Sequence, residues 1–172
     1  AIGCDVDSIH LVIPASDLHI TQKLKKSRDE IKQRALESAE YAKSHGLRVE
    51  FSAEDASRAD MGFLKELYGV ARDIKADRIC FCDTVGILYP SKVREIVQEL
   101  LEVGIPLSFH GHNDFGLATI NSVEALLSGA REVHVTINGL GERAGNAPLE
   151  EVIVVLEELH GIKTGIRREG VR

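Results

Sequence analysis

The stretch RVEFSAEDASRADMGFLKELYGVARDIKADRICFCD, residues 48–83, reads as two strands joined by a helix. Its ends, residues 48–54 and 78–83, are short apolar runs typical of buried strands. Between them lies one helical stripe of apolar side chains, formed by Met61, Leu64, Leu67, Tyr68, Ala71 and Ile74. Strands that alternate with helices pair in parallel through right-handed crossovers, so this stretch predicts one βαβ unit.

The same alternation continues on both sides of this unit. Three more strand-like runs occupy residues 8–15, 106–112 and 132–139. From residue 48 onward the strand starts are about 30 residues apart, the size of one βα unit. No G-x-G-x-x-G follows the first strand, which argues against a dinucleotide-binding sheet. Periodicity alone leaves two α/β folds open, a doubly wound sheet and a closed barrel.

Helix boundary signals support the same count. Ser27 and Glu30 form an S-x-x-E capping box that opens a helix, and His45 followed by Gly46 ends it. Three further helices are predicted, behind Pro90, over residues 120–127 and behind Pro148. The sequence therefore predicts five strands and five helices.

A (β/α)₈ TIM barrel needs eight such units and typically about 250 residues, whereas this chain has 172 residues. We therefore expect residues 1–172 to be a partial TIM-barrel catalytic domain. The five units would be the last five of the barrel, strands four to eight, with strands one to three absent.

The composition limits the classes of partner. A net charge of -6 argues against nucleic acid, which requires clustered Lys and Arg. No apolar run has the length of a membrane span, and the first residues do not resemble a signal peptide. Three cysteines suggest no disulfide framework, and we expect Cys80 and Cys82 to pack in the core. A cytoplasmic protein without nucleic-acid or membrane partners is expected.

Polar residues gather at the carboxyl ends of the predicted strands, where α/β barrels carry their active sites. These residues are Glu54, Asp83, Thr84, His110, His112 and Asn138. His110 and His112 are two residues apart on one strand, so their rings project from the same face and can chelate one metal ion. The alternative, a hydrogen-bonded pair of core histidines, is weakened because Gly111, Asn113 and Asp114 offer little to pack against.

Two further segments contribute candidate residues. The glycine-rich loop NGLGERAGNAP, from Asn138, can bring Glu142, Arg143 and Asn146 towards the same ion, although Asn146 is equally a candidate helix cap. Glu54 follows an apolar strand, where partial desolvation would raise its proton affinity and suit an acid or base; an N-cap or a solvated loop acid is the alternative.

Asp55 has the opposite parity to Glu54 and is expected to point away from the site. Residue spacing alone assigns no role to four other polar residues near strand ends: His10, Ser16, His19 and His134.

Taken together, FHGHNDFGLAT, GLGERAGNAPLEE, DTVG and FSAEDASR resemble the isopropylmalate, citramalate and homocitrate synthases. These enzymes are related to the 3-hydroxy-3-methylglutaryl-CoA lyases, and the resemblance runs from about Ser8 to Leu159. It implies a TIM barrel that condenses acetyl-CoA with a small-molecule 2-oxo acid at a divalent metal ion, zinc, manganese or magnesium. It also leads us to expect a homodimer.

The resemblance implies a role for each matching residue. His110, His112 and Asn146 would hold the metal, and Glu54 and Glu142 would lie in the catalytic pocket. Thr84 would bind the carboxylate of the 2-oxo acid, while Ser16 and His19 match a segment that lines the substrate region. We also expect His10 to contact the substrate. The family's further metal ligand, an Asp beside a catalytic Arg on the first barrel strand, has no counterpart here.

Several functions remain open within this resemblance. The motifs GERAGN and HNDFGLAT favour 2-isopropylmalate synthase, which uses 2-oxoisovalerate in leucine biosynthesis, over homocitrate and citramalate synthases. An acyl-CoA lyase is disfavoured because no cysteine follows Cys82, whereas the lyases carry one in the loop after the last strand. A non-catalytic half-barrel is the alternative from another class.

Overall fold

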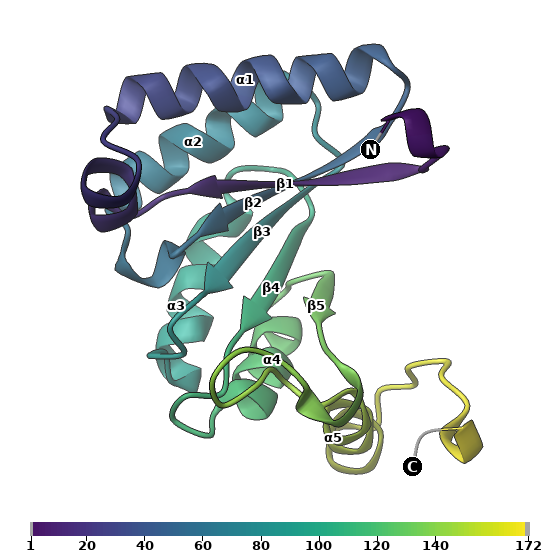
Figure 1. Cartoon of the computed structure of the whole chain (residues 1–172). Coiled ribbons are helices and arrows are strands. Elements are labelled where there is room, and N and C mark those ends of the chain that lie inside the picture. Colours follow the sequence, from purple (N-terminus) through teal and green to yellow (C-terminus); the bar gives the residue numbers. More distant parts are fainter. Residues whose placement is uncertain (1, 171–172) are drawn as a thin grey trace.

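Five parallel strands, hydrogen-bonded in the order of the sequence, form one curved sheet in the computed structural model, which describes residues 2–170 (Figure 1). The strands are β1 (Ser8–Pro14), β2 (Arg48–Glu54), β3 (Arg78–Asp83), β4 (Leu107–Gly111) and β5 (Glu132–His134). The helices between and after them are α1 (Arg28–Ser44), α2 (Met61–Asp73), α3 (Pro90–Leu101), α4 (Ala118–Leu127) and α5 (Leu149–Val154). This partial (β/α) barrel confirms the predicted fold class.

The two faces of the sheet have opposite chemistry. Phe51, Ile79 and Leu107 occupy one row of neighbouring strands and are fully buried in the core that the helices cover. The alternate row carries Ser52, Cys80 and Ser108 on the other face. Because side chains alternate along a strand, most polar residues of the strands are collected on the face that the helices leave open; the buried Asp83 at the end of β3 is an exception.

The main difference from prediction lies at the fifth strand. The run 132–139 was expected to be extended throughout, but β5 ends at His134. After it, Thr136 accepts a hydrogen bond from Leu149 and a short helical turn covers Ile137–Gly139, with Asn138 at a φ of 58°. The backbone leaves the sheet early because it must enter the glycine-rich loop.

Both helix signals at α1 are confirmed. The Ser27 hydroxyl accepts a hydrogen bond from the backbone N–H of Glu30, whose carboxylate accepts one from the N–H of Ser27. His45 is the C-terminal cap, and Gly46 follows it with a φ of 75°.

The capping box gives a first testable prediction. Replacing Ser27 by alanine removes the acceptor for an N–H at the helix start, and we expect a loss of about 0.5–2 kcal/mol in the free energy of unfolding. Urea unfolding followed by circular dichroism measures it. Ser38→Ala, at an exposed position inside α1, is the matched control and should cost nothing; equal losses would show that the cap contributes nothing specific.

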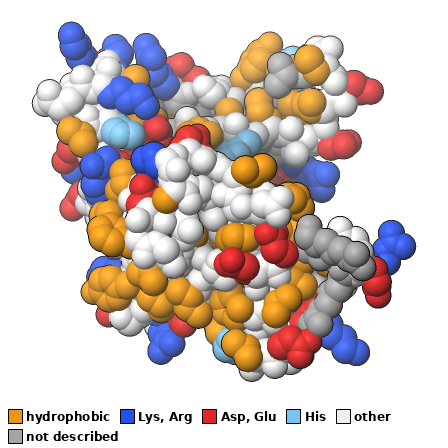
Figure 2. Space-filling view, turned by 60° about the horizontal axis from the view of Figure 1, so that its bottom comes forward, with side chains coloured by type: hydrophobic (Ala, Val, Ile, Leu, Met, Phe, Trp, Pro, Cys, Tyr) orange, Lys and Arg blue, Asp and Glu red, His pale blue; other side chains and the backbone are white. Residues whose placement is uncertain are grey.

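The surface mixes hydrophobic, acidic and basic groups. Figure 2 shows several separate hydrophobic groups on one side of the molecule, with charged side chains between them. Within residues 2–170 no helix has both the length and the apolar character needed to cross a bilayer.

Candidate functional site

The polar face of the sheet opens into a cleft at the carboxyl ends of the strands. This cavity has a volume of about 290 Å³. Six of the nine predicted site residues line it: His10, Glu54, Thr84, His110, His112 and Glu142. The structure thus brings together side chains that the sequence separates widely, whereas Ser16, His19 and Asn146 lie outside the lining.

His110 and His112 face each other inside the cleft. Their Nε2 atoms are 3.1 Å apart, and the rings are at 83° to one another. Burial, and after it the nearby charges of His134 and His112, lower the pKa of His110 to about 4. The neutral imidazole that results is the form that binds metal ions.

The two rings have the geometry of ligands to one ion. Metal–nitrogen bonds of about 2.1 Å place two imidazole nitrogens about 3.0–3.4 Å apart on a shared ion, and the observed distance falls in this interval. Without an ion, the lone pairs of the two nitrogens would repel each other unless one ring donated a hydrogen bond to the other.

Asn146 supplies a second test of the fit. Its Oδ1 and the Nδ1 of His112 are buried without a hydrogen-bond partner among the described residues. Asn146 lies beside His112 through an antiparallel backbone bridge. Helix α5 is preceded by Pro148 and has no side-chain cap, so the capping interpretation of Asn146 is wrong. A buried oxygen without a donor is costly, and a cation would satisfy it.

The glycine-rich loop is held by steric constraints at its glycines. A Cβ on Gly145 would lie 2.1 Å from the carbonyl oxygen of Gly139, and a Cβ on Gly141 would lie 1.8 Å from Oδ1 of Asn146. Gly145 also has a φ of 92°. Only glycine permits this close approach of backbone to backbone.

Arg143 joins three loops instead of entering the cleft. Its guanidinium donates to both oxygens of Asp114, at 2.6 and 2.7 Å, and to the carbonyl oxygen of Thr84 at 2.8 Å. The loops after β3, β4 and β5 are thereby fixed relative to one another. Arg143 was predicted to come close to the metal ion, but its guanidinium instead holds Asp114 and the Thr84 backbone in place.

Glu142 points into the cleft from the same loop. The pKa of its carboxyl is lowered, first by a hydrogen bond from its own backbone N–H and then by the charges of His112 and His110. The carboxylate is therefore the prevailing form at neutral pH.

Thr84 presents a hydroxyl hydrogen without an acceptor. Its Oγ1 accepts a 2.8 Å hydrogen bond from the backbone N–H of Asp55, and no acceptor for its own hydrogen is found within residues 2–170. The hydroxyl is therefore oriented by the protein and free to donate to a ligand in the cleft.

Ser16 and His19 form a cluster with Glu54 and Asp55 next to the cleft. The Ser16 hydroxyl donates to Asp55 at 2.5 Å, and the His19 ring nitrogens are 3.4 Å from Glu54 and 3.7 Å from Asp55. Glu54 also receives a hydrogen bond from Lys23. Glu54 is half-buried and has the basic side chains of Lys23 and His19 beside it, so its expected role as an acid or base stays a prediction.

Asp55 is the residue of this cluster that parity misjudged. It was expected to point away from the site, yet its side chain is fully buried and binds both Ser16 and Arg58. The alternation stops at Glu54 because Asp55 has a φ of 61°, outside the extended region. No periodic signal could have revealed its partners.

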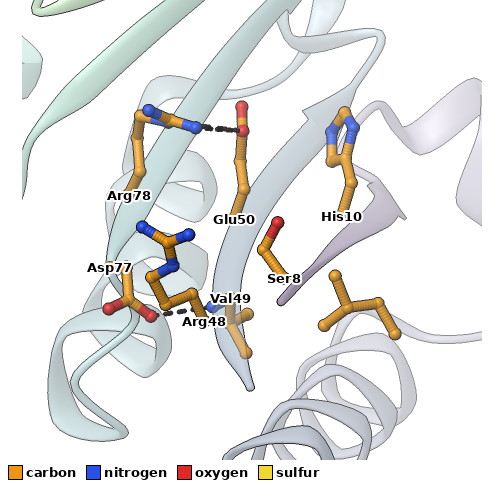
Figure 3. Close-up of a pocket in the computed structure, with 8 residues that line it drawn as sticks. Ser8, His10, Arg48, Val49, Glu50, Asp77 and Arg78 are labelled. Atoms are coloured by element: carbon orange, nitrogen blue, oxygen red, sulfur yellow. Dashed lines mark hydrogen bonds and ion pairs between the residues drawn. The ribbon is translucent and has the colours of Figure 1, made fainter. Parts of the chain in front are cut away.

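A charged network underlies the cleft towards the amino ends of the strands. Figure 3 shows Glu50 bonded to Arg78. Both residues line a hollow of about 440 Å³, which His10 and Arg48 also line. Glu50 further accepts from Ser108 at 2.9 Å and lies 2.9 Å from Nε2 of His134. No sequence motif pointed to Glu50.

Cys80 and Cys82 are buried as predicted, but their surroundings are polar. Both belong to the open face of β3, where Cys80 approaches Cys82 and His134. Burial raises the pKa of the Cys80 thiol, but its hydrogen bonds to Cys82 and His134 outweigh burial and lower the pKa to about 5. The hydrogen bond with Cys80, followed by burial, raises the pKa of Cys82 well above its usual value.

Several known proteins are similar to this chain in sequence or in fold. A model of the HMGL-like family matches residues 1–171. A relative from Methanosarcina mazei, provisionally named an (R)-citramalate synthase, is 60% identical over 99% of this chain and 36% of its own length. The (R)-citramalate synthase of Methanocaldococcus jannaschii is 53% identical over 98% of this chain and 35% of its own length. The chain thus spans about a third of the curated relatives that it matches.

Solved structures show the same fold. The hydroxymethylglutaryl-CoA lyase of Pseudomonas aeruginosa superposes with a TM-score of 0.86 at 20% sequence identity, over 99% of this chain and 61% of the lyase. At this identity the likeness concerns the barrel architecture.

Proposed function

This chain belongs to the HMGL-like family, and from that premise we propose that it supplies part of the active site of an enzyme that condenses acetyl-CoA with a 2-oxo acid. We propose further that the 2-oxo acid is pyruvate and the product citramalate. The activity depends on a divalent cation held by His110, His112 and Asn146.

One observation carries this proposal more than any other. The Nε2 atoms of His110 and His112 are 3.1 Å apart within a cleft that also contains two carboxylates, Glu54 and Glu142. Nitrogen ligands beside carboxylates provide a site for an ion and, next to it, groups that accept protons. This is the combination that condensation of an acetyl group with a ketone requires.

Binding of the 2-oxo acid rests on Thr84. Its free hydroxyl hydrogen is available to the substrate carboxylate, while the Asp55 amide holds the oxygen in place. The hydrogen bonds of Arg143 to Asp114 and to the Thr84 carbonyl fix the position of this hydroxyl relative to His110 and His112. When bound, the ion polarises the ketone oxygen and stabilises the charge that develops there.

The proton to be removed is on the methyl group of acetyl-CoA. Glu142 and Glu54 line the cleft, and we propose that an oxygen of one of them accepts this proton. The enolate carbon then attacks the ketone carbon, and hydrolysis of the thioester releases CoA. A positioned base contributes about 10²–10⁴ in rate.

The relatives favour citramalate synthase over isopropylmalate synthase, the reading that the sequence motifs favoured. Their names specify citramalate, whose hydroxyl-bearing carbon carries a methyl group, and condensation with pyruvate leaves that methyl group. The motifs HNDFGLAT and GERAGN hold the metal and the loop, which all these condensing enzymes need, so they do not report which 2-oxo acid is bound.

The test is release of CoA thiol by the full-length protein with pyruvate, 2-oxoisovalerate and 2-oxoglutarate in turn. We expect release with pyruvate, abolished by a chelator and restored by Mn²⁺ or Zn²⁺. Release with 2-oxoisovalerate alone would return the assignment to isopropylmalate synthase. If the folded, metal-loaded protein released no thiol with any of these acids, the proposed condensing reaction would be wrong. Cleavage of an acyl-CoA would then be the next reaction to test.

A further inference from the structure

A short row of titratable side chains leads from the cleft past Glu54 to the loop after β1. The short helix Leu18–Lys23 in this loop carries His19, and a 2.9 Å hydrogen bond from the Ala15 N–H to the Glu54 carbonyl joins the loop to the end of β2. Nδ1 of His19 is 3.4 Å from a carboxylate oxygen of Glu54, and Nε2 is 3.7 Å from one of Asp55. The ring therefore lies between a carboxylate of the cleft and a fully buried one.

Asp55 is fixed so that its carboxylate faces one edge of this ring. It accepts hydrogen bonds from the Ser16 hydroxyl at 2.5 Å and from the Arg58 guanidinium at 2.8 Å. The Ser16 oxygen also accepts a 3.2 Å hydrogen bond from the backbone N–H of His19, so one serine holds both groups. A carboxylate that faces Nε2 favours the hydrogen on that nitrogen. The lone pair of Nδ1 is then directed at Glu54.

The surroundings of Nδ1 fit this tautomer. The atom is buried and has no hydrogen-bond partner within residues 2–170, although an oxygen of Glu54 lies 3.4 Å away. Two acceptors that face each other share no hydrogen, which is the arrangement expected while Glu54 is a carboxylate. Once Glu54 has accepted a proton, its O–H can donate to Nδ1. Catalytic hydrogen bonds often shorten to their working length only when substrate is bound.

Glu54 needs a route of this kind because the substrates cover its other side. Acetyl-CoA and the 2-oxo acid displace water from the cleft that Glu54 lines. Lys23 approaches the second oxygen of Glu54 at 3.2 Å, but an ammonium group has no lone pair with which to accept a proton. His19 is not part of the cleft lining, and its side chain is 18% exposed. The ring can therefore pass a proton on to water.

We propose that His19 takes the proton from Glu54 after the abstraction step and passes it to water, with Asp55 as the positioning residue that sets the tautomer of the ring. In this step the O–H bond of Glu54 breaks and an Nδ1–H bond forms. The imidazolium then gives the proton to water, and both side chains regain their initial states. His19 acts through Glu54 and does not touch the substrate. The inference rests on the proposed condensation and assigns the proton-accepting role to Glu54 instead of Glu142.

Two variants of the full-length protein, His19→Ala and His19→Gln, test this route. Neither alanine nor glutamine carries a proton, so we expect kcat with pyruvate to fall about 10²-fold in both. The KM for pyruvate should change little, because His19 does not line the cleft. Imidazole added to the buffer should restore part of kcat in His19→Ala by occupying the space of the missing ring. His160→Ala is the matched control: His160 is exposed, and this variant should keep its kcat and show no response to imidazole.

Full kcat in His19→Gln would overturn the inference, as would a loss in His19→Ala that imidazole does not restore or that appears in KM alone. Failure of the proposed function is distinct, because the unaltered protein would then release no thiol with any 2-oxo acid.

Nitrogen NMR of protein with ¹⁵N-labelled histidine gives a reading that does not depend on turnover. At a pH where the ring of His19 is neutral, its hydrogen should be on Nε2. The signal is assigned by its absence from His19→Ala. A hydrogen on Nδ1 would overturn the inference whatever the activity.

Discussion

Replacing His112 by alanine in the full-length protein is expected to abolish tight binding of the divalent cation at His110, His112 and Asn146 and to lower kcat/KM with pyruvate by about 10²–10³. An ion that polarises a ketone supplies several kcal/mol of charge stabilisation, and each 1.4 kcal/mol is a factor of ten in rate. The variant removes one of two nitrogens that lie 3.1 Å apart, so the remaining ring cannot chelate alone. Isothermal titration with Mn²⁺ and the CoA thiol assay measure the two effects.

His45→Ala is the matched control for this variant, because His45 is exposed and serves only to end α1. It should bind Mn²⁺ and turn over like the unaltered protein. The metal assignment would be abandoned if His112→Ala retained full affinity for Mn²⁺ and full activity while its circular dichroism spectrum was unchanged.

Replacing Gly145 by alanine should have the second large effect. The new Cβ would lie 2.1 Å from the carbonyl oxygen of Gly139, and the residue would remain at a φ of 92°. Such backbone strain costs about 1–3 kcal/mol, and the clash must in addition move the loop. A shift of about 1 Å in groups that position the substrate can cost a factor of about 10². We therefore expect a lower Tm and about a 100-fold loss in kcat/KM.

Gly69→Ala is the matched control, because the same substitution there should raise the stability of the protein instead of lowering it. Gly69 lies inside α2, and an added Cβ there has no atom within 4 Å. This substitution should stabilise the protein by about 0.5–1 kcal/mol and leave the activity unaltered. If Gly145→Ala instead raised the Tm or preserved full activity, the loop would not be held in the way that the backbone contacts indicate.

The strands were predictable because each obeys a local rule. Residues 48–54 and 78–83 form short apolar runs whose side chains alternate between the helix-covered face and the open face. These runs predicted the bounds of β2 and β3 to the residue. Strand β5 was predicted too long because its end is set by distant contacts: Thr136 bonds with Ala147 and Leu149. The sequence pattern of residues 132–139 contains no sign of these contacts.

The same reasoning explains which parts of the site were found. Parity and strand ends identified His110, His112, Glu54 and Thr84 as cleft residues, since the side chains on one face of a parallel sheet share one environment. Pairs that join separate loops were missed. Arg143 finds Asp114 across 29 residues, and His134 finds Glu50 across a greater separation, through contacts that only the folded chain creates.

The sheet has an apolar face that packs against the helices and a polar face that lines the cleft. Different residues therefore determine the stability of the fold and the chemistry of the site. Phe51 and Ile79 pack in the core that the helices cover, whereas Cys82 and His110 line the cleft. Substitutions on the open face can therefore change the substrate without removing the apolar contacts that stabilise the fold. For an engineer, the loops after β3, β4 and β5 form one exchangeable cassette, and Arg143 together with Asp114 must be transferred with it.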